Sequence, residues 1–591
     1  MAEKVNGKAL DTRLIGRLLS YTRPYQGRFV LALVSTLVLA LLMPVRPMIF
    51  QHMLDNEIIK GDLGGLRILV VAVTVLLMVQ ALVTYYNTYL TNWLGQSVIR
   101  DIREQVFQHI TRMRLSFFDS RPIGMLQTRT ISDVETLNDV FTSGLVRIFS
   151  EILQLLVIMA AMFYTNWRLS LMVLTTMPLL LFATYVFKNS IKQAFQGVRE
   201  AVSNMNAFLQ EHITGMSIVH IFNREEEEMS RFQEINRDLR RANLKSVMAY
   251  SIFFPVVEII TALGMAILVW YGASRALIGE LQFGVLVAFI MYIQMFFRPL
   301  RMLADQFNTL QLGMVSAERI FKVLDTEEAI PDEGKAKLSE SDPHNGVQKG
   351  ISIAFEEVNF AYKEPDWVLD SINLKVNPGE KVALVGATGS GKTTIINLLS
   401  RFYEIQKGKI YVNGTDIKSI SLSELRQLIG VVLQDVFLFS GSIRQNITLN
   451  NDDVPMEAII EAARQVGADG FIQQLPGGYD YQVRERGVTL SLGQRQLIAF
   501  ARVLIYDPAI LVLDEATANI DTESEEVIQH AIDTIMAGRT SIIIAHRLST
   551  IQKADKIVVL EKGRIIEMGS HQELLQQEGA YHTLHQLQFA G

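Results

Sequence analysis

Long apolar runs fill the first half of the chain, and short apolar runs separated by polar turns fill the second half. A helix that crosses a bilayer needs about 20 mostly apolar residues. After Ile351, short apolar strands alternate with amphipathic helices, a pattern typical of an α/β domain. The pattern predicts an all-α membrane domain of six helices fused to a soluble α/β domain. The six spans are expected approximately at Phe29–Phe50, Leu66–Leu90, Leu145–Tyr164, Leu169–Phe187, Met248–Tyr271 and Phe283–Leu303.

Polar stretches divide the chain further. Arginines flank the apolar run Leu14–Leu19, which predicts a short amphipathic helix in the membrane interface or an ordinary basic flank. Between Ile330 and Gly350 the chain is polar and has no apolar period, as a linker would be. We therefore expect a cytoplasmic N-terminal amphipathic segment at 1–28, the transmembrane domain at 29–320, a linker at 321–350 and the soluble domain at 351–591.

Charged residues predict how the spans are oriented. The long connections Arg100–Val140 and Lys188–Lys245 are rich in Lys and Arg, whereas the short loop Met53–Leu63 is mainly acidic. Positive residues favour the cytoplasmic side of a membrane. Both termini and the soluble domain are therefore expected in the cytoplasm, in a multi-pass protein of the inner or plasma membrane.

Composition narrows the possible functions. Of the 591 residues, 49% are hydrophobic, which is high for a soluble enzyme of this size. The net charge of −6 gives no reason to expect a nucleic-acid partner. Because the chain has no cysteine, disulfide bonds and thiolate metal sites are excluded.

A phosphate-binding loop follows the predicted buried strand Val382–Val385. It reads Gly386-Ala387-Thr388-Gly389-Ser390-Gly391-Lys392-Thr393 and leads into a helical pattern. Glycines let backbone N–H groups close around phosphates, and the positive end of the helix dipole attracts them. Lys392 can reach the β- and γ-phosphates, and Thr393 can hold Mg²⁺. The loop predicts a nucleoside triphosphate and Mg²⁺ as ligands.

Two adjacent carboxylates follow a second buried strand, Ile510–Leu513. Asp514 is placed to bind Mg²⁺, directly or through water, and Glu515 to orient or deprotonate an attacking water. The pair could instead cap the next helix. The phosphate-binding loop favours the catalytic interpretation.

The run Leu490-Ser491-Leu492-Gly493-Gln494 lies between the phosphate-binding loop and these carboxylates. It resembles the Leu-Ser-Gly-Gly-Gln signature of the nucleotide-binding domain of ABC transporters. Because six predicted spans share the chain with one such domain, the resemblance is to exporter-type half-transporters, both multidrug-resistance-like and lipid-exporting. It implies ATP as the nucleotide and a soluble domain with the α/β P-loop ATPase fold. It also implies a dimer in which each signature completes the ATP site of the opposite chain.

The resemblance covers the whole soluble domain and implies further site residues. Tyr362 would stack on adenine, with Trp367 as a nearby competitor, and Gln434 would meet Mg²⁺ and the attacking water. Glu515 and His546 would complete the catalytic set, with His546 contacting the γ-phosphate. The implied nucleotide-binding residues are Tyr362, Gly386, Thr388, Gly389, Ser390, Gly391, Lys392, Thr393, Thr394 and Asp514, with Ser491, Gly493 and Gln494 acting across the interface. The implied metal ligands are Thr393, Gln434 and Asp514.

Two cytoplasmic segments, Phe117-Phe118-Asp119 and Glu211–Phe222, resemble the intracellular loops that contact the motor domains in ABC exporters. A surface hairpin with no coupling role is the alternative. Charges within apolar segments are candidates for function. Glu258, the most interior of them, could contact a cationic substrate or pair with Arg46 or Arg298. The residues of a substrate cavity do not follow from the sequence.

Leu492 replaces a glycine of the signature. It is either a harmless variant in a homodimer or the mark of a heterodimer in which this chain keeps an intact Glu515 but offers an imperfect signature to its partner. We favour the heterodimer. The predicted function is ATP-driven export of amphipathic small molecules, drugs or lipids. The alternatives are a homodimeric lipid flippase and, in another class, an ATP-gated channel or regulatory ATPase, against which Glu515 and His546 argue because they favour turnover.

Overall fold

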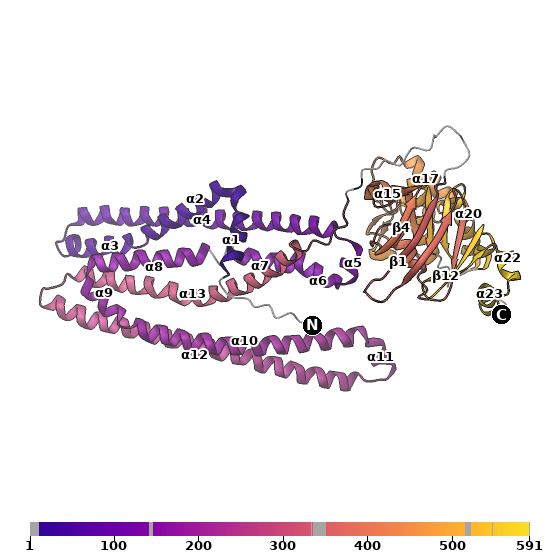
Figure 1. Ribbon diagram of the computed structural model, residues 1–591. Helices are drawn as coiled ribbons and strands as arrows, with labels where there is room; N and C mark the ends of the chain where they lie inside the picture. Colours follow the sequence, from indigo (N-terminus) through magenta and orange to yellow (C-terminus); the bar gives the residue numbers. More distant parts are fainter. Residues whose placement is uncertain are drawn as a thin grey trace. The chain divides into compact units, whose positions relative to one another are not determined.

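The computed structural model describes residues 11–140, 146–332, 334, 350–514, 522–545 and 548–589, without the side chains of 146, 300–308, 311, 522–524, 549 and 587–589. The chain divides into two compact units. The helical unit comprises Met1–Thr111 and Arg121–Glu327, and the sheet unit comprises Arg112–Ser120 and Glu328–Gly591. Figure 1 shows both units and labels many of their elements.

The helical unit contains several helices that are much longer than a bilayer is thick. The helix α4 has 49 residues and α12 has 53, whereas about 20 residues suffice for a span. In Figure 1, α10 and α12 lie side by side along their length. The helices are α1 (Thr12–Ser20), α2 (Gln26–Leu42), α3 (Val45–His52), α4 (Leu63–Thr111), α6 (Ile123–Thr128), α7 (Val134–Asp139), α8 (Val146–Thr165), α9 (Trp167–Leu174), α10 (Met177–Thr214), α11 (Met216–Ile221), α12 (Glu225–Leu277) and α13 (Phe283–Leu324).

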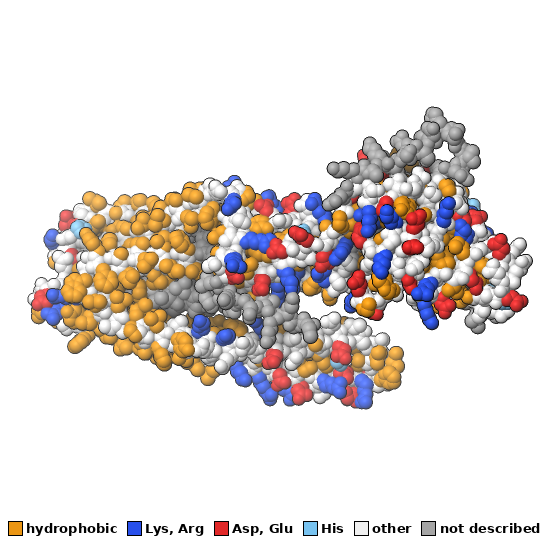
Figure 2. Space-filling model, viewed as in Figure 1, with side chains coloured by type: hydrophobic (Ala, Val, Ile, Leu, Met, Phe, Trp, Pro, Cys, Tyr) orange, Lys and Arg blue, Asp and Glu red, His pale blue; other side chains and the backbone are white. Residues whose placement is uncertain are grey.

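Apolar side chains cover one end of the helical unit (Figure 2). Within the described residues, five helical stretches are long and apolar enough to cross a membrane. A sixth apolar stretch, Phe283–Pro299, begins α13 but is shorter. Side chains such as Ile68 and Leu82 of α4 are largely exposed, as expected of residues that face lipid rather than water. The unit is therefore a membrane domain, with five of the six expected spans meeting the length criterion.

The N-terminal run Leu14–Leu19 is helical and forms most of α1. The carboxylate of Asp11 caps this helix by accepting the backbone N–H of Arg13 at 2.9 Å. Leu18 is fully buried, and Arg17 forms two hydrogen bonds of 2.7 Å with the carboxylate of Asp325, next to the end of α13. The segment is an amphipathic helix that packs on its own unit.

The sheet unit alternates strands and helices. Its strands are β1 (Ile353–Phe360), β2 (Leu369–Val376), β3 (Lys381–Val385), β4 (Lys407–Val412), β5 (Thr415–Asp416), β6 (Ile429–Val432), β7 (Gly441–Ser442), β8 (Gln482–Val483), β9 (Ile510–Asp514), β10 (Thr540–Ile544), β11 (Lys556–Glu561) and β12 (Arg564–Gly569). Its helices are α5 (Leu115–Asp119), α14 (Lys392–Leu399), α15 (Leu422–Leu428), α16 (Ile443–Thr448), α17 (Met456–Gln465), α18 (Asp469–Gln474), α19 (Leu492–Tyr506), α20 (Thr522–Met536), α21 (Leu548–Gln552), α22 (His571–Gln576) and α23 (Ala580–Phe589).

Two sheets form the framework of this unit. An antiparallel sheet has the order β2-β1-β4-β5, and a larger sheet has the order β12-β11-β3-β10-β9-β6. In the larger sheet, β3, β10, β9, β6 and β11 run parallel. Alternate residues of β3 enter two different hydrophobic cores, with Ala383 in one and Val382 in the other. The sheet is therefore buried on both faces, as is typical of parallel α/β sheets.

Candidate functional site

The larger sheet brings three of the predicted site segments to one edge. Strands β3, β9 and β6 are parallel, so their carboxyl ends lie at the same side of the sheet. Gly386 directly follows β3, Asp514 is the last residue of β9, and Gln434 comes two residues after β6. Ligands of open α/β sheets bind at this edge.

The loop after β3 has a backbone that requires glycine at two positions. Gly386 has φ of 150°, and a Cβ added there would lie 2.2 Å from the carbonyl oxygen of Leu560. Gly391 has φ of 103° and precedes α14, and its added Cβ would lie 2.6 Å from Cδ2 of Leu369. Residues with a side chain rarely adopt such conformations. The loop therefore curves tightly from the strand into the N-terminus of α14, the geometry that presents N–H groups to an anion.

Lys392 lies within this curve. Its ammonium group donates to the carbonyl oxygens of Gly386 at 2.8 Å and Ala387 at 3.0 Å. Burial lowers the pKa of Lys392, and the negative charge of Asp514 opposes that shift. The hydroxyl oxygen of Ser390 is buried and has no hydrogen-bond partner in the described structure. A ligand that offers oxygens to the Lys392 ammonium and the Ser390 hydroxyl would offset the free-energy cost of burying these two polar groups.

The two remaining loop threonines differ in environment. Thr393, at the start of α14, is exposed, whereas Thr394 is buried. The phenol oxygen of Tyr362 lies 3.2 Å from the hydroxyl of Thr394, so the structure brings Tyr362 to the loop. Trp367 instead lies against Lys407, whose ammonium nitrogen is 5.5 Å from the indole ring. Thr388 and Gly389 are exposed at the outer turn of the loop.

The signature run begins the helix α19. Ser491 caps this helix, and Ser491 and Gln494 form a reciprocal capping box with hydrogen bonds of 3.0 and 3.2 Å. Gly493 is buried, and Leu492, half-buried, has helical backbone angles at the first position of the helix. Within the described residues, no hydrogen bond joins the signature to the loop after β3. The structure therefore gathers the loop, Tyr362, Gln434 and Asp514 at one sheet edge, and the signature hydrogen bonds described above stay within α19 and its cap.

Glu515 and His546 lie outside the described residues. Both follow described strands, since Glu515 comes after β9 and His546 comes two residues after β10. These strands neighbour each other at the same sheet edge.

The sequence interpretation missed a second group of residues beside Tyr362. Tyr403 and Gln406, in the segment between α14 and β4, contact Tyr362 and its neighbour Ala361. The run Arg401-Phe402-Tyr403 could have signalled this segment, because it places two aromatic residues directly after the helix of the loop.

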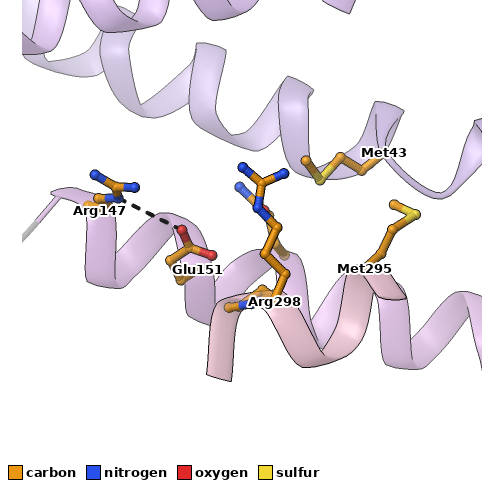
Figure 3. A pocket seen from close by; sticks show the side chains of 7 residues that line it. Met43, Arg147, Glu151, Met295 and Arg298 are labelled. Atoms are coloured by element: carbon orange, nitrogen blue, oxygen red, sulfur yellow. Dashed lines mark ion pairs between the residues drawn. The ribbon is translucent and has the colours of Figure 1, made fainter. Parts of the chain in front are cut away.

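A cavity of about 170 Å³, lined by both charged and apolar side chains, lies in the helical unit among α2, α8 and α13 (Figure 3). Arg147 points toward Glu151 on the same helix, with Nε and Oε1 3.9 Å apart, and Arg298 reaches in from α13. The remaining lining residues are Met43, Gln154, Met295 and Pro299. Two guanidinium groups and one carboxylate give the cavity a formal net positive charge.

Two family models match this chain. The model described as the ABC transporter transmembrane region matches residues 29–300, and the model described as ABC transporter matches residues 369–518. The first match covers most of the helical unit, and the second covers the loop after β3, the signature and Asp514.

Individual proteins match along most of their length. The probable multidrug resistance ABC transporter ATP-binding/permease protein YheH of Bacillus subtilis is 38% identical, over 90% of this chain and 78% of that protein. The ATP-dependent lipid A-core flippase of Syntrophus aciditrophicus is 34% identical, over 97% of this chain and 94% of that protein. The structure of a bacterial Atm1-family ABC exporter with ATP bound superposes with a TM-score of 0.78 at 28% identity, covering 96% of this chain and 99% of that one.

Proposed function

We propose a specific function from one premise: this chain belongs to the ABC transporter family, as an exporter-type half-transporter. Its sheet unit binds and hydrolyses ATP, and hydrolysis drives export. The finer proposal is that it exports amphipathic small molecules, drugs or lipids across the plasma membrane as one half of a dimer. It has six spans, and both termini and the sheet unit lie in the cytoplasm. The observation that carries it is the phosphate loop at one sheet edge in a chain with membrane-spanning helices.

Each residue gathered at the carboxyl edge of the larger sheet has a role in binding ATP in this proposal. The loop from Gly386 to Thr394 would surround the phosphates, with Lys392 turning from its present carbonyl partners to the β- and γ-phosphates. The exposed hydroxyl of Thr393, the carboxylate of Asp514 and the amide oxygen of Gln434 are the oxygen ligands that suit Mg²⁺. When bound, Mg²⁺ would neutralise charge on the phosphates. Tyr362 would offer its exposed ring to adenine.

Glu515 is proposed as the general base, and His546 as a contact to the γ-phosphate. Glu515→Gln should reduce ATP hydrolysis by about 10²-fold or more, because the amide cannot accept the proton from the attacking water. Binding of a fluorescent ATP analogue should remain within about twofold of the unchanged protein, since a neutral isostere leaves the phosphate loop intact. Turnover of purified protein in lipid nanodiscs measures the first quantity.

Glu526→Gln is the matched control for this experiment, because it makes the same chemical change at an exposed position of α20. It should leave both quantities unchanged. Normal hydrolysis by Glu515→Gln would show that another group acts as the base.

The dimer is supported by an apolar patch at the tip of the α10–α12 hairpin. Five side chains around α11 are exposed there, although each is large and apolar. Contiguous exposed apolar surface marks an interaction site. We propose that the sheet unit of the second half-transporter covers this patch. Its residues are Ile213, Met216, Ile218, Ile221 and Phe222.

The partner is proposed to be a different half-transporter. The reason is Leu492, which would face the nucleotide bound by the opposite chain and would hinder close approach of the signature. Because Ser491, Gly493 and Gln494 are unchanged, the partner's site would be weakened rather than lost. Purification of the tagged chain from its native membrane tests this point, and recovery of a homodimer alone would contradict it.

A homodimeric lipid flippase is the second candidate, and the charged cavity favours it. A volume of about 170 Å³ is too small for a drug-sized molecule but suits a single phosphate group of a lipid head group. Arg147 and Arg298 together would attract a phosphate or carboxylate. Lipid A should then stimulate ATP hydrolysis, and Arg298→Ala should lower that stimulation more than Gln154→Ala. Equal stimulation of all three proteins would remove this candidate.

A further inference from the structure

The segment Arg401–Gln406, here called the bridging loop, connects α14 to β4 and is held to the strand that precedes Tyr362. The side-chain amide of Gln406 accepts the backbone N–H of Ala361 at 3.1 Å and donates to the carbonyl of the same residue at 2.8 Å. This pairing imitates the hydrogen bonds of a neighbouring strand. The backbone on one side of Tyr362 therefore moves together with the bridging loop.

Ring contacts hold the Tyr362 side chain to the same loop. The ring of Tyr403 meets the ring of Tyr362 edge-on, with centroids 5.0 Å apart and an interplanar angle of 88°. Phe360 meets Tyr362 in the same manner at 4.9 Å. Edge-to-face pairs are a favourable aromatic geometry. These contacts hold the Tyr362 ring in place. Because Tyr362 is still 47% exposed, part of the ring remains open to a ligand.

The opposite end of Tyr403 contacts the segment that leads to the membrane. Its phenol donates a hydrogen bond to the carboxylate of Asp119, the last residue of α5. Burial raises the pKa of Tyr403, and the bond to Asp119 raises it further, so the phenol keeps its proton at neutral pH. The helix α5 follows α4, the long helix that contains the second expected span, after only three residues.

Further hydrogen bonds hold the bridging loop, and the segment near α5, in fixed positions. The guanidinium group of Arg401 is almost completely buried and donates to the carbonyl oxygens of Ile417 at 3.0 Å and Pro331 at 3.1 Å. Near α5, the N–H of Arg114 donates to the carbonyl of Glu328 at 3.0 Å. A displacement of the Tyr403 ring is therefore transmitted to its phenol oxygen rather than absorbed by the loop.

We propose that Tyr403 is a positioning residue that couples occupancy of the Tyr362 ring to the position of Asp119, and so to the membrane domain. This proposal rests on the proposed function, in which Tyr362 receives the adenine of ATP. A stacked base fixes the tilt of the Tyr362 ring. The edge-to-face contact then sets the position of the Tyr403 ring, and the hydrogen bond from its phenol sets the position of the Asp119 carboxylate at the end of α5.

Removal of single atoms tests the proposal. Tyr403→Phe deletes the phenol oxygen but keeps the ring contact with Tyr362, and Asp119→Ala deletes the acceptor. Tyr479→Phe is the matched control, because the phenol of Tyr479 donates to the carboxylate of Asp469 at 2.8 Å elsewhere in the sheet unit. All variants are made in the full chain, assembled with its partner in nanodiscs.

Two measurements distinguish a loss of coupling between the units from a loss of folding. Binding of a fluorescent ATP analogue reports the sheet unit. The distance between spin labels at Lys60→Cys and Ile278→Cys reports the helical unit, and the chain's lack of cysteine makes such labelling specific. For Tyr403→Phe and for Asp119→Ala, nucleotide affinity should change by less than about twofold, while the size of the distance change at saturating ATP should fall roughly twofold or more.

The double variant should resemble either single variant, because both remove the same bond, and Tyr479→Phe should behave as the unchanged protein. A normal ATP response of Tyr403→Phe, or effects that multiply in the double variant, would overturn the proposal. An unchanged protein that neither binds nor hydrolyses ATP would instead overturn the proposed function, and this inference with it.

Discussion

Gly391 shows how strongly a single residue constrains the phosphate loop. Its φ of 103° lies in a region that other residues avoid, and Leu369 occupies the space where a Cβ would stand. The residue thus combines a backbone requirement with a steric one. It also caps α14, so any shift there displaces the N–H groups that face the phosphates.

We expect Gly391→Ala to lower the free energy of unfolding by about 1–3 kcal/mol because of this strain, and to lower ATP affinity at least tenfold. Thermal unfolding and binding of a fluorescent ATP analogue measure the two effects. Gly470→Ala is the control, since its added Cβ meets no atom within 4 Å. Equal behaviour of the two variants would contradict the argument.

Leu492, at the start of α19, differs from Gly391 because its backbone does not require glycine. Its backbone is helical, so the chain itself has no need for glycine at this position. Any effect of Leu492 must therefore come from the side chain, and it must act on whatever approaches the N-terminus of α19.

Leu492→Gly is accordingly expected to lower the free energy of unfolding by about 1 kcal/mol, the cost of glycine in a helix, and to raise ATP turnover of the assembled transporter several-fold. The gain should survive in the Glu515→Gln variant, because it arises at the partner's site. Turnover of the two variants and their combination distinguishes these contributions. An unchanged rate would support the harmless-variant reading.

At the scale of elements, α23 is attached to α22 through a histidine. Nδ1 of His571 lies 2.7 Å from the phenol oxygen of Tyr581, which is almost completely buried. The ring of His585, on α23, lies 5.8 Å from that of His571. Gln552 also approaches His571, with Nε2 atoms 3.5 Å apart.

Burial lowers the pKa of His571, and repulsion from His585 lowers it further. Because the folded form binds a proton less readily than the unfolded form, docking of α23 should weaken as the pH falls below about 6.5. Hydrogen-exchange protection of 580–589 should be lower at pH 5.5 than at pH 7.5. His571→Gln removes the titrating group and should flatten this dependence; a dependence that persists would exclude His571 as its origin.

Elements also show what the sequence can and cannot predict. For five of the six expected spans, the apolar runs predicted helical stretches that are long and apolar enough to cross a membrane, because lipid selects side chains over about 20 residues. The apolar run Leu66–Leu90 ends well before Thr111, where α4 ends, but the polar connection that follows is helical in pattern, and helical hydrogen bonds are indifferent to the polarity of side chains. The phosphate loop was predictable because its residues are contiguous. The pairing of Gln406 with Ala361 was not, because 45 residues separate the partners and no motif joins them.

At the scale of the whole molecule, the exposed apolar patch around α11 is consistent with a surface that a second half-transporter covers. Ile221→Asp should therefore lower ATP turnover of the assembly at least fivefold and leave ATP binding within about twofold, because a charge opposes burial in an interface. Met229→Asp, at an exposed apolar position of α12 outside the patch, should have little effect on either. Equal losses in both variants would mean that the patch has no special role.

The length of α4 has a consequence for the amplitude of motion. A straight helix of 49 residues is about 74 Å long. If such a rod tilts by about 5°, its far end moves by about 6 Å, more than the length of a typical side chain. The helix is thus a lever arm: a small rotation about a point near Thr111 becomes a shift of several ångströms at Leu63.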